Sequence, residues 1–436
     1  MSSVRSFLFG PMGPDEVISS IDISVAFLQA SEFDAQDVTR YVKYTPYKGA
    51  NSQYYKLRGP LYGQRSSPRR WFNTIKGWLI AQGFKQGSNE ICAFTNPKTG
   101  VKVLCFVDDL IVKGSKEASD AFYATLSDPK KGFECKDPSY LEVGSGLNYV
   151  GFDVNMELND EGNKVIYIDQ EDQVLEFLES YGIQPTQGVT VATPYIIDKH
   201  IIHGKSELLD EEEASEYRSK IGSLNYFSSS IRYDIAQQVS KLSQYMAHPT
   251  KGAKLGVDRV IRYMASTSNF RIEGRVTSAC EYIHYSDSDH AGDKPYNTRS
   301  QTGVLLTLNK VPVHWKSNKQ TATAYSSAAA EVMALSEAVR QARFLQWAGI
   351  DMGYDKIEKV YMRVDSKGAR YFQSSSVLDS RLKGYFDLRE AWIQELRDTE
   401  KVGVVAVSGE NNLSDLLTKT HKSSRFKSLL RLIRAA

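Results

Sequence analysis

The twelve residues Val101–Val112, which read VKVLCFVDDLIV, constrain the fold more than any other stretch of this chain. Two short apolar runs flank a tight junction at residues 106–109, a pattern typical of two antiparallel strands joined in a hairpin. Asp108 and Asp109 then lie in apolar surroundings, where an uncompensated charge is costly. Either water solvates both acids at the hairpin tip, or a divalent cation such as Mg²⁺ compensates them.

Another aspartate occurs in a strand-like context nearer the N-terminus. Asp22 lies in SIDISVAFL (residues 20–28), which predicts a strand running into a helix. Aspartates from separate strands that meet at one point can hold two metal ions, as in enzymes of in-line phosphoryl transfer. Phe27 follows in the same stretch, and its apolar setting alone favours a role in the core.

Length and composition exclude several classes of protein. The 436 residues predict two to four domains with ample core, and the 41% apolar and 24% charged content is that of an ordinary globular protein. The net charge of +2 means that any nucleic-acid binding must come from local basic patches. Four scattered cysteines without metal-like spacing predict reduced thiols in an intracellular protein, and no apolar run approaches a membrane span.

Residues 54–71 (YYKLRGPLYGQRSSPRRW) combine aromatic side chains with five cations, among them Arg65 and Arg69. This mixture suits a groove that follows a nucleic-acid backbone and stacks its bases, although a solvated helix start has a similar composition. An amphipathic helix is predicted to follow over Trp71–Gly83. Further along, Gly151 is predicted to be a bulge glycine in a strand, and Ile166–Tyr181 to form a helix.

Four acids in the last third occur where predicted elements begin or end. Asp287 and Asp365 follow strand-like runs, Glu331 opens a strongly helical stretch, and Asp387 precedes a helix containing Trp392. Taken singly, such acids at element ends mean little.

The motifs described above, in the order in which they occur along the chain, resemble those of the Pol polyprotein of copia-type LTR retrotransposons. Asp22 with Ala26-Phe27-Leu28, then Leu61-Tyr62-Gly63 with Pro68, Arg69 and Trp71, and then Phe106-Val107-Asp108-Asp109 follow the order of its reverse transcriptase. The resemblance implies that Asp22, Asp108 and Asp109 bind catalytic metal ions. It also implies that Phe27 selects deoxynucleotides, that Arg65 and Arg69 contact the substrate, and that Gly151 belongs to the segment positioning the primer end.

The acids of the last third resemble the ribonuclease H domain of the same polyprotein. Asp287, Glu331, Asp365 and Asp387 match its four metal-binding carboxylates in order and approximate spacing, and residues 408–419 match its closing signature. The resemblance implies two Mg²⁺ or Mn²⁺ ions in each of the two active sites. Asp289 and Glu337 are weaker candidates for a role there.

Several departures from the family bear on activity. Ser66 stands where the family has glutamine, Phe106 where it has tyrosine, His290 where it has tryptophan and Tyr385 where it has histidine. The long fingers segment that precedes the first catalytic aspartate in the family is expected to be missing, which places polymerase competence in doubt.

The expected fold is a multidomain α/β (α+β) protein. Residues 1–164 are expected to form partial polymerase fingers and palm, 165–275 a helical thumb and connection, 276–420 a ribonuclease H-like mixed sheet, and 421–436 a basic tail that frays. The resemblance implies DNA synthesis from dNTPs on an RNA template, coupled to cleavage of RNA in RNA/DNA hybrids. It also implies a cytoplasmic location in virus-like particles, with nuclear entry, self-association and assembly with other polyprotein products left open.

Two alternatives remain from the sequence. In one, only the ribonuclease H half is active and the polymerase half holds the hybrid. In the other, the chain is a non-enzymatic nucleic-acid binder derived from a retroelement.

Overall fold

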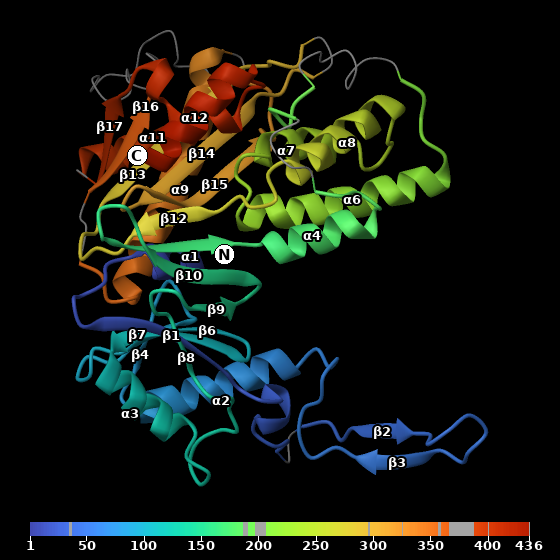
Figure 1. Cartoon of the computed structure of the whole chain (residues 1–436), viewed down its shortest axis with the longest axis vertical. Coiled ribbons are helices and arrows are strands. Elements are labelled where there is room, and N and C mark those ends of the chain that lie inside the picture. The colour runs from blue at the N-terminus through green and yellow to red at the C-terminus, as the bar shows by residue number, and fades with distance from the viewer. Residues whose placement is uncertain are drawn as a thin grey trace. The chain divides into compact units, whose positions relative to one another are not determined.

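The computed structural model describes residues 1–34, 37–185, 191–196, 206–294, 297–324, 326–355, 359–365, 388–399 and 401–435. The chain divides into two compact units (Figure 1). The larger unit comprises Met1–Pro11, Gly151–Ile350 and Tyr354–Ala436, and the smaller one Met12–Val150 and Asp351–Gly353. Both units mix helices with sheets, which confirms the α/β class. The boundaries of the four expected domains stay predictions, because compact units need not coincide with functional domains.

The smaller unit is built on a six-stranded antiparallel sheet. In sheet order its strands are β4 (Lys85–Gln86), β5 (Ala93–Thr95), β6 (Lys102–Phe106), β7 (Asp109–Ser115), β1 (Glu16–Asp22) and β8 (Ser139–Tyr140). The remaining elements are η1 (Ala26–Gln29), β2 (Tyr41–Tyr44), β3 (Gln53–Lys56), α2 (Ser67–Ala81), α3 (Lys116–Leu126) and β9 (Gly146–Tyr149). The hairpin predicted over Val101–Val112 is therefore confirmed as β6 and β7.

The core of the smaller unit lies between its sheet and the helices α2 and α3. Trp71, Ile75 and Leu79, spaced four residues apart along α2, are buried against strand residues such as Val103 and Val112. This spacing places one apolar stripe of the helix against the sheet. The helix predicted from Trp71 is confirmed, and it begins earlier, at Ser67.

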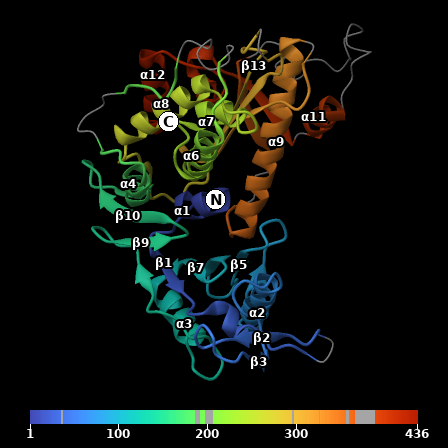
Figure 2. The same ribbon diagram turned by 90° about the vertical axis from the view of Figure 1, so that its right-hand side faces the viewer.

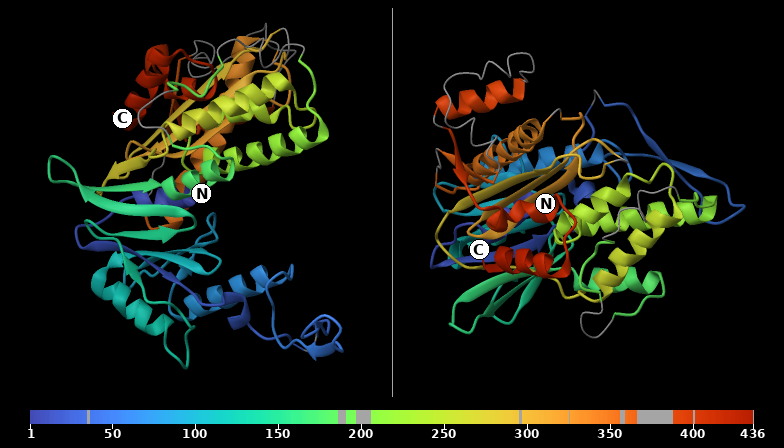
Figure 3. Two further views of the ribbon diagram at one scale, coloured as in Figure 1. Left: turned by 45° about the vertical axis from the view of Figure 1, so that its right-hand side comes forward. Right: turned by 90° about the horizontal axis from the view of Figure 1, so that it is seen from above.

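The larger unit contains three antiparallel strands, which belong to a four-stranded sheet, and a group of helices. The strands are β10 (Phe152–Leu158), β11 (Lys164–Asp169) and β12 (Ile272–Arg275), and the helices are α1 (Ser2–Phe9), α4 (Glu171–Ser180), α6 (Glu211–Ser230), α7 (Ala236–Ser243) and α8 (Lys251–Ala265). Figure 3 shows α6, α7 and α8, coloured green to yellow, gathered together. The helix predicted over Ile166–Tyr181 was wrong in its first part, because residues 164–169 pair with β10 as a strand.

The larger unit also contains the two terminal helices, of which the C-terminal one departs from expectation. The N-terminal segment forms α1, where Phe7, Leu8 and Phe9 are buried. Arg5 of α1 is buried as well, and its guanidinium lies 4.0 Å from the ring centroid of Trp315. The C-terminal tail forms α12 (Ser423–Ala435), which is docked rather than frayed, since Phe426, Leu429 and Ile433 are buried.

A five-stranded mixed sheet completes the larger unit. In sheet order its strands are β15 (Val311–Lys319), β14 (Gln301–Leu308), β13 (Tyr282–Asp289), β16 (Val360–Val364) and β17 (Val402–Ala406). The first three strands pair antiparallel, whereas β13, β16 and β17 pair parallel. The mixed sheet expected over residues 276–420 is therefore confirmed.

Helices flank this sheet. They are α9 (Ser327–Asp351), α11 (Leu388–Asp398), η2 (Gly409–Asn411), η3 (Leu413–Leu417) and α12. The hydroxyl of Tyr282 in β13 donates a hydrogen bond to the carbonyl oxygen of Leu345 in α9. Figure 2 shows α9 along its length. On η3, Leu417 accepts a hydrogen bond from Ser317 of β15. Within the described part of the chain, no helix has the length and apolar character that crossing a membrane would require.

A buried ion pair joins the helices of the larger unit. Arg232 and Asp234, 2% and 0% exposed, form two hydrogen bonds of 3.0 and 2.9 Å, and Tyr263 donates to Asp234 at 2.8 Å. Removing one partner leaves a buried charge uncompensated, so Arg232→Met should lower the free energy of unfolding by about 3–5 kcal/mol. Urea denaturation measures this change.

The matched control is Arg275→Met, which removes an arginine from an exposed pair with Glu161. Its expected cost is below about 1 kcal/mol. If both variants lose the same free energy of unfolding, the buried pair does not stabilise the fold more than an exposed pair does.

Candidate active site

Three acids from distant parts of the sequence meet at one edge of the mixed sheet. Asp287 lies near the end of β13, Asp365 directly follows β16, and Glu331 is the fifth residue of α9. One carboxylate oxygen from each lies within 4.8 Å of the others. Because the parallel register pairs His284 with Met362, it also brings Asp287 level with Asp365. We call Asp287, Glu331 and Asp365 the carboxylate cluster.

Burial makes the carboxylate cluster a strongly repulsive arrangement. Asp287 is 1% and Glu331 7% exposed. Burial, together with the charges of Asp287 and Asp365, raises the pKa of Glu331 to about 9. The pKa of Asp365 is likewise raised by burial and by Asp287. Within the described residues, Oε2 of Glu331 is buried without a hydrogen-bond partner. A cation would fit both the excess charge and this orphaned oxygen.

The segment after η3 supplies positive charge and a donor to the cluster. Nζ of Lys419 lies 3.2 Å from Oδ2 of Asp287 and 2.6 Å from Oδ1 of Asp415, and Thr418 donates its hydroxyl to Asp287. Burial alone would lower the pKa of Lys419, but Asp287 and Asp415 raise it above its usual range. Gly303 of β14 permits this close approach, because a Cβ there would lie 2.7 Å from the carbonyl oxygen of Ser414.

Asp415 is a fourth acid beside the cluster, and the sequence analysis missed it. Lys419 bridges it to Asp287, and Arg425 lies 3.2 Å away. Although burial opposes it, the bond from Lys419 holds the pKa of Asp415 below its usual range. The signal was present in the closing signature SDLLTK, which places an acid after the last strand of the sheet. Asp387, the predicted fourth ligand, lies outside the described residues.

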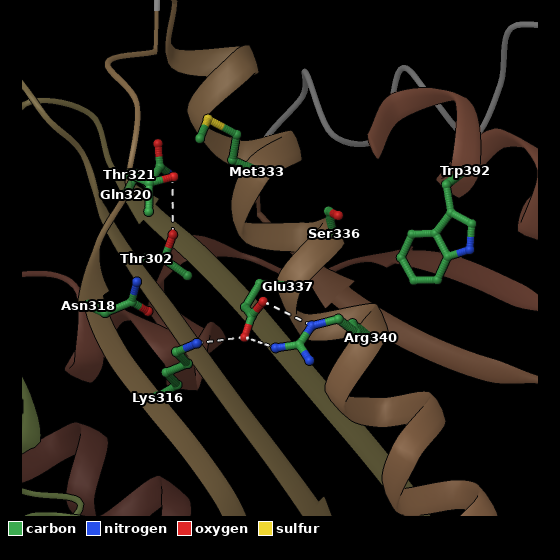
Figure 4. Close-up of a pocket in the computed structure, with 10 residues that line it drawn as sticks. All are labelled: Thr302, Lys316, Asn318, Gln320, Thr321, Met333, Ser336, Glu337, Arg340 and Trp392. Atoms are coloured by element: carbon green, nitrogen blue, oxygen red, sulfur yellow. Dashed lines mark hydrogen bonds and ion pairs between the residues drawn. The ribbon is translucent and has the colours of Figure 1, made fainter. Parts of the chain in front are cut away.

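The two weaker candidates have different surroundings. Burial raises the pKa of Asp289, which follows the cluster on β13. Glu337 instead lies between Lys316, at 2.7 Å, and Arg340, at 2.8 Å, and the bonds from these cations outweigh burial and lower its pKa to about 2. Figure 4 shows this arrangement in a cavity of about 610 Å³ that Trp392 also lines. Glu337 therefore has its charge balanced already.

In the smaller unit, the hairpin acids also approach one another. Asp22 of β1 and Asp109 of β7 are directly paired across the sheet, and Asp108 lies in the turn between β6 and β7. Val107 in this turn has φ +56°, a strained conformation for a β-branched residue. The turn is held by the indole of Trp71, which donates to the carbonyl of Val107 at 2.5 Å.

The electrostatics of the hairpin acids are milder than those of the carboxylate cluster. Burial, then Asp108 and Asp22, raise the pKa of Asp109 to about 6. Lys136 forms a 2.5 Å ion pair with Asp22. Among the described residues, only the carboxylate cluster brings three ligand atoms within 4.8 Å, so the hairpin acids do not form such a set here.

The predicted substrate-binding residues are dispersed. Phe27 is half-buried against the core and its ring centroid lies 4.8 Å from that of Tyr62, whereas Arg65 and Arg69 are exposed. Gly151 belongs to the larger unit, and it lies in a turn with φ +74° rather than in a strand bulge. Their roles in binding stay predictions.

The comparisons with known proteins point to one class, the Pol polyproteins of retrotransposons. No protein-family model matches the chain. It is 27% identical to the retrovirus-related Pol polyprotein from transposon RE1 of Arabidopsis thaliana, over 98% of this chain and 28% of that protein. For transposon TNT 1-94 of Nicotiana tabacum the identity is 25%, over 98% of this chain and 31% of that protein.

A yeast protein is similar to the chain, as are the two plant proteins. The chain is 24% identical to the transposon Ty1-DR1 Gag-Pol polyprotein of Saccharomyces cerevisiae, over 94% of this chain and 23% of that protein. The resemblance to copia-type Pol polyproteins is therefore confirmed as a similarity along nearly the whole chain, which spans roughly a quarter to a third of the length of these relatives. Among solved structures, LC11-RNase H1 in complex with RNA/DNA hybrid matches at 22% identity over 32% of this chain and 94% of that one. Its TM-score is 0.24, too low to establish a shared fold.

The raised pKa of Glu331 predicts an unusual pH dependence of stability. A carboxyl with a pKa of about 9 in the folded state keeps a proton that the unfolded chain has already lost above its usual value of 4.5. Stability should therefore fall as pH rises from about 5 towards 9, by at most about 1.4 kcal/mol per pH unit from this group. Urea unfolding in excess chelator at several pH values measures the slope.

Glu331→Gln is the matched variant, since it keeps the shape and cannot ionise. It should flatten the slope and stabilise the protein above pH 7 in chelator. A slope unchanged by this substitution would mean that Glu331 is not protonated in the folded protein.

Proposed function

We propose that this chain is an RNA-directed DNA polymerase with ribonuclease H activity, the reverse transcriptase region of a retrotransposon. The observation that carries the proposal is the carboxylate cluster, in which three carboxylate oxygens lie within 4.8 Å at the edge of a mixed sheet. Similarity to retrotransposon Pol polyproteins along nearly the whole chain supports it.

For cleavage of RNA in a hybrid, the cluster residues would hold the metal ions. Two Mg²⁺ or Mn²⁺ ions, when bound, supply activation of water and stabilisation of charge at the scissile phosphate. Asp287 and Asp365 present oxygens from adjacent strands, and Glu331 gives up its proton as it becomes a ligand. Lys419 and Thr418 orient Asp287 from the opposite side. Hybrid recognition would use backbone and 2′-hydroxyl contacts, so sequence preference should be weak.

For DNA synthesis, Asp22, Asp108 and Asp109 would be the metal ligands, with dNTPs and a primed RNA template as substrates. The cross-strand pairing of Asp22 with Asp109 supports this role. The raised pKa of Asp109, caused first by burial and then by its two acidic neighbours, fits a site that a cation would stabilise. Phe27, Arg65, Arg69 and Gly151 are the proposed substrate contacts.

A second candidate function is hybrid cleavage alone, with the polymerase half acting as a scaffold. The specific observation in its favour is the contrast between the two acidic sites. The hairpin acids lack three oxygens within 4.8 Å among the described residues, and Asp22 is already ion-paired with Lys136. A non-enzymatic role has less support, because the carboxylate cluster is buried at an energetic cost that a mere binding protein does not need.

One gel assay separates these functions. A labelled RNA template annealed to a DNA primer is incubated with Mg²⁺ and dNTPs, and extension and cleavage are measured together. Asp365→Asn should reduce cleavage by about two to three orders of magnitude, as for loss of other groups that stabilise transition-state charge, and leave extension intact. Asp108→Asn should do the reverse.

The outcomes are distinct. Cleavage without extension in the unmodified chain would support the second candidate. The absence of both activities in the presence of Mg²⁺ or Mn²⁺ would contradict the proposal. So would full activity in excess chelator.

Asp387 is kept as the proposed fourth metal ligand of the cleavage site, and Asp415 is proposed as a positioning residue that acts on Asp287 through Lys419. Its link through Lys419 to Asp287 supports this assignment. Asp415→Asn should therefore lower the cleavage rate by at least about tenfold, the loss typical when a group supporting metal ligands is removed. Asp387→Asn is the matched comparison, and it should lower the rate further, by about two to three orders of magnitude, because it removes a proposed metal ligand itself. The reverse ranking, measured in single-turnover assays, would contradict these two assignments.

A further inference from the structure

The C-terminal helix α12 is fixed to the body of the larger unit. Phe426 lies with its ring centroid 5.3 Å from Tyr195 and 5.8 Å from Tyr263 of α8. Leu429 and Ile433, one and two turns further on, are also buried. One face of α12 is thus anchored, and the opposite face has a fixed orientation towards solvent.

That outer face is positive and has no compensating acids. The sequence contains no aspartate or glutamate after Asp415. Four cations on and beside α12 are exposed and make no ion pair with any described residue. They are Lys422, Lys427, Arg431 and Arg434. Lys427 and Arg431, four residues apart, repel each other, which costs the helix a few tenths of a kcal/mol.

Some exposed cations of the same unit are ion-paired: Lys251 pairs with Glu207, Arg275 with Glu161, and Arg340 with Glu337. Others, such as Lys164, Arg262 and Lys310, make no ion pair with a described residue, but they are scattered over the unit. The cations of α12 differ because they lie together on one helix with no acid in its sequence. They form a local excess of charge on a rigid helix, which is complementary to a polyanion.

A cleft with both polar and apolar lining adjoins this face. It has a volume of about 480 Å³, and Lys427 and Arg434 of α12 line it together with Ser266, Thr267 and Asn269 at the end of α8. Arg434 lies 5.2 Å from the ring centroid of Phe270, which fixes its position. The acid of the cleft, Glu273, is already paired with Arg271 at 2.9 Å. The cleft thus offers two cations and several hydroxyl and amide groups to an anion.

We propose that the outer face of α12 and the adjoining cleft bind the sugar–phosphate backbone of a nucleic acid. The identity of the polyanion rests on the function proposed above. Contacts of this kind carry no sequence information, and each releases bound counterions from the nucleic acid. With thirteen residues, α12 is about 20 Å long, enough to follow several phosphates beyond the carboxylate cluster.

The salt dependence of binding tests this surface. The triple variant Lys427→Gln, Arg431→Gln, Arg434→Gln is made in the full chain with Asp365→Asn, which prevents cleavage of the probe. Fluorescence anisotropy with a labelled RNA/DNA hybrid is measured in chelator from 50 to 200 mM salt. The slope of log K against log salt should become shallower by about 2–3, since each lost phosphate contact contributes about 0.9 for B-form duplex and about 0.7 for single strands.

The matched control is Lys251→Gln, Arg275→Gln, Arg340→Gln, which removes the same charge from ion-paired sites of the same unit. Its slope should equal that of the parent. A charge-preserving variant, Lys427→Arg with Arg431→Lys and Arg434→Lys, should retain the parent slope. Circular dichroism should be unchanged in all variants, because the substituted side chains are exposed.

Equal slopes for the triple variant and the parent would overturn the proposal. So would a triple variant that keeps hybrid binding and loses binding to anionic phosphatidylserine vesicles, because the face would then be a membrane surface. A cleavage assay on the chain with an intact Asp365 distinguishes failure of this surface from failure of the proposed function. If the chain cleaves the hybrid but the triple variant keeps the parent slope, only the binding surface on α12 is refuted. If the chain does not cleave the hybrid, the proposed function is refuted, and the salt slope remains an independent result.

Discussion

Mutual repulsion among Asp287, Glu331 and Asp365 is the constraint on which the candidate active site depends. Their oxygens are held within 4.8 Å by the parallel pairing of β13 with β16 and by the second turn of α9. The folded protein reduces the repulsion by keeping a proton on Glu331 and by placing Lys419 against Asp287. Such an arrangement costs stability, and it is expected where a bound cation repays the cost during function.

The two acidic sites differ in how strongly their surroundings require a cation. In the carboxylate cluster, burial raises the pKa of Glu331 to about 9, whereas the pKa of Asp109 in the hairpin rises to about 6. Lys136 reaches Asp22 from the surface, where an ion pair is weak and easily exchanged. A pKa of about 6 lets Asp109 remain ionised at pH 7 without a metal. This contrast is why cleavage is the better supported half of the proposed function.

Local patterns were predictable from the sequence, and long-range contacts were not. The β6–β7 hairpin was predicted because twelve consecutive residues contain both strands and the turn. Residues 166–169 were assigned to a helix because their pairing with β10 is not visible in their own apolar pattern. Asp415 was missed because its place beside Asp287 depends on Gly303, which lets η3 approach β14 closely. The docking of α12 likewise depends on Tyr195 and Tyr263, far away in the sequence.

Proton release on metal binding tests the central claim most directly. Mg²⁺ or Mn²⁺ is titrated calorimetrically at pH 7 into the Asp108→Asn protein, in two buffers with different ionisation enthalpies. Because Glu331 holds a proton when the carboxylate cluster is empty, binding should release about one proton. Glu331→Gln in the same background should bind more weakly and release none. Saturable binding without proton release, or no binding at the cluster, would contradict the account.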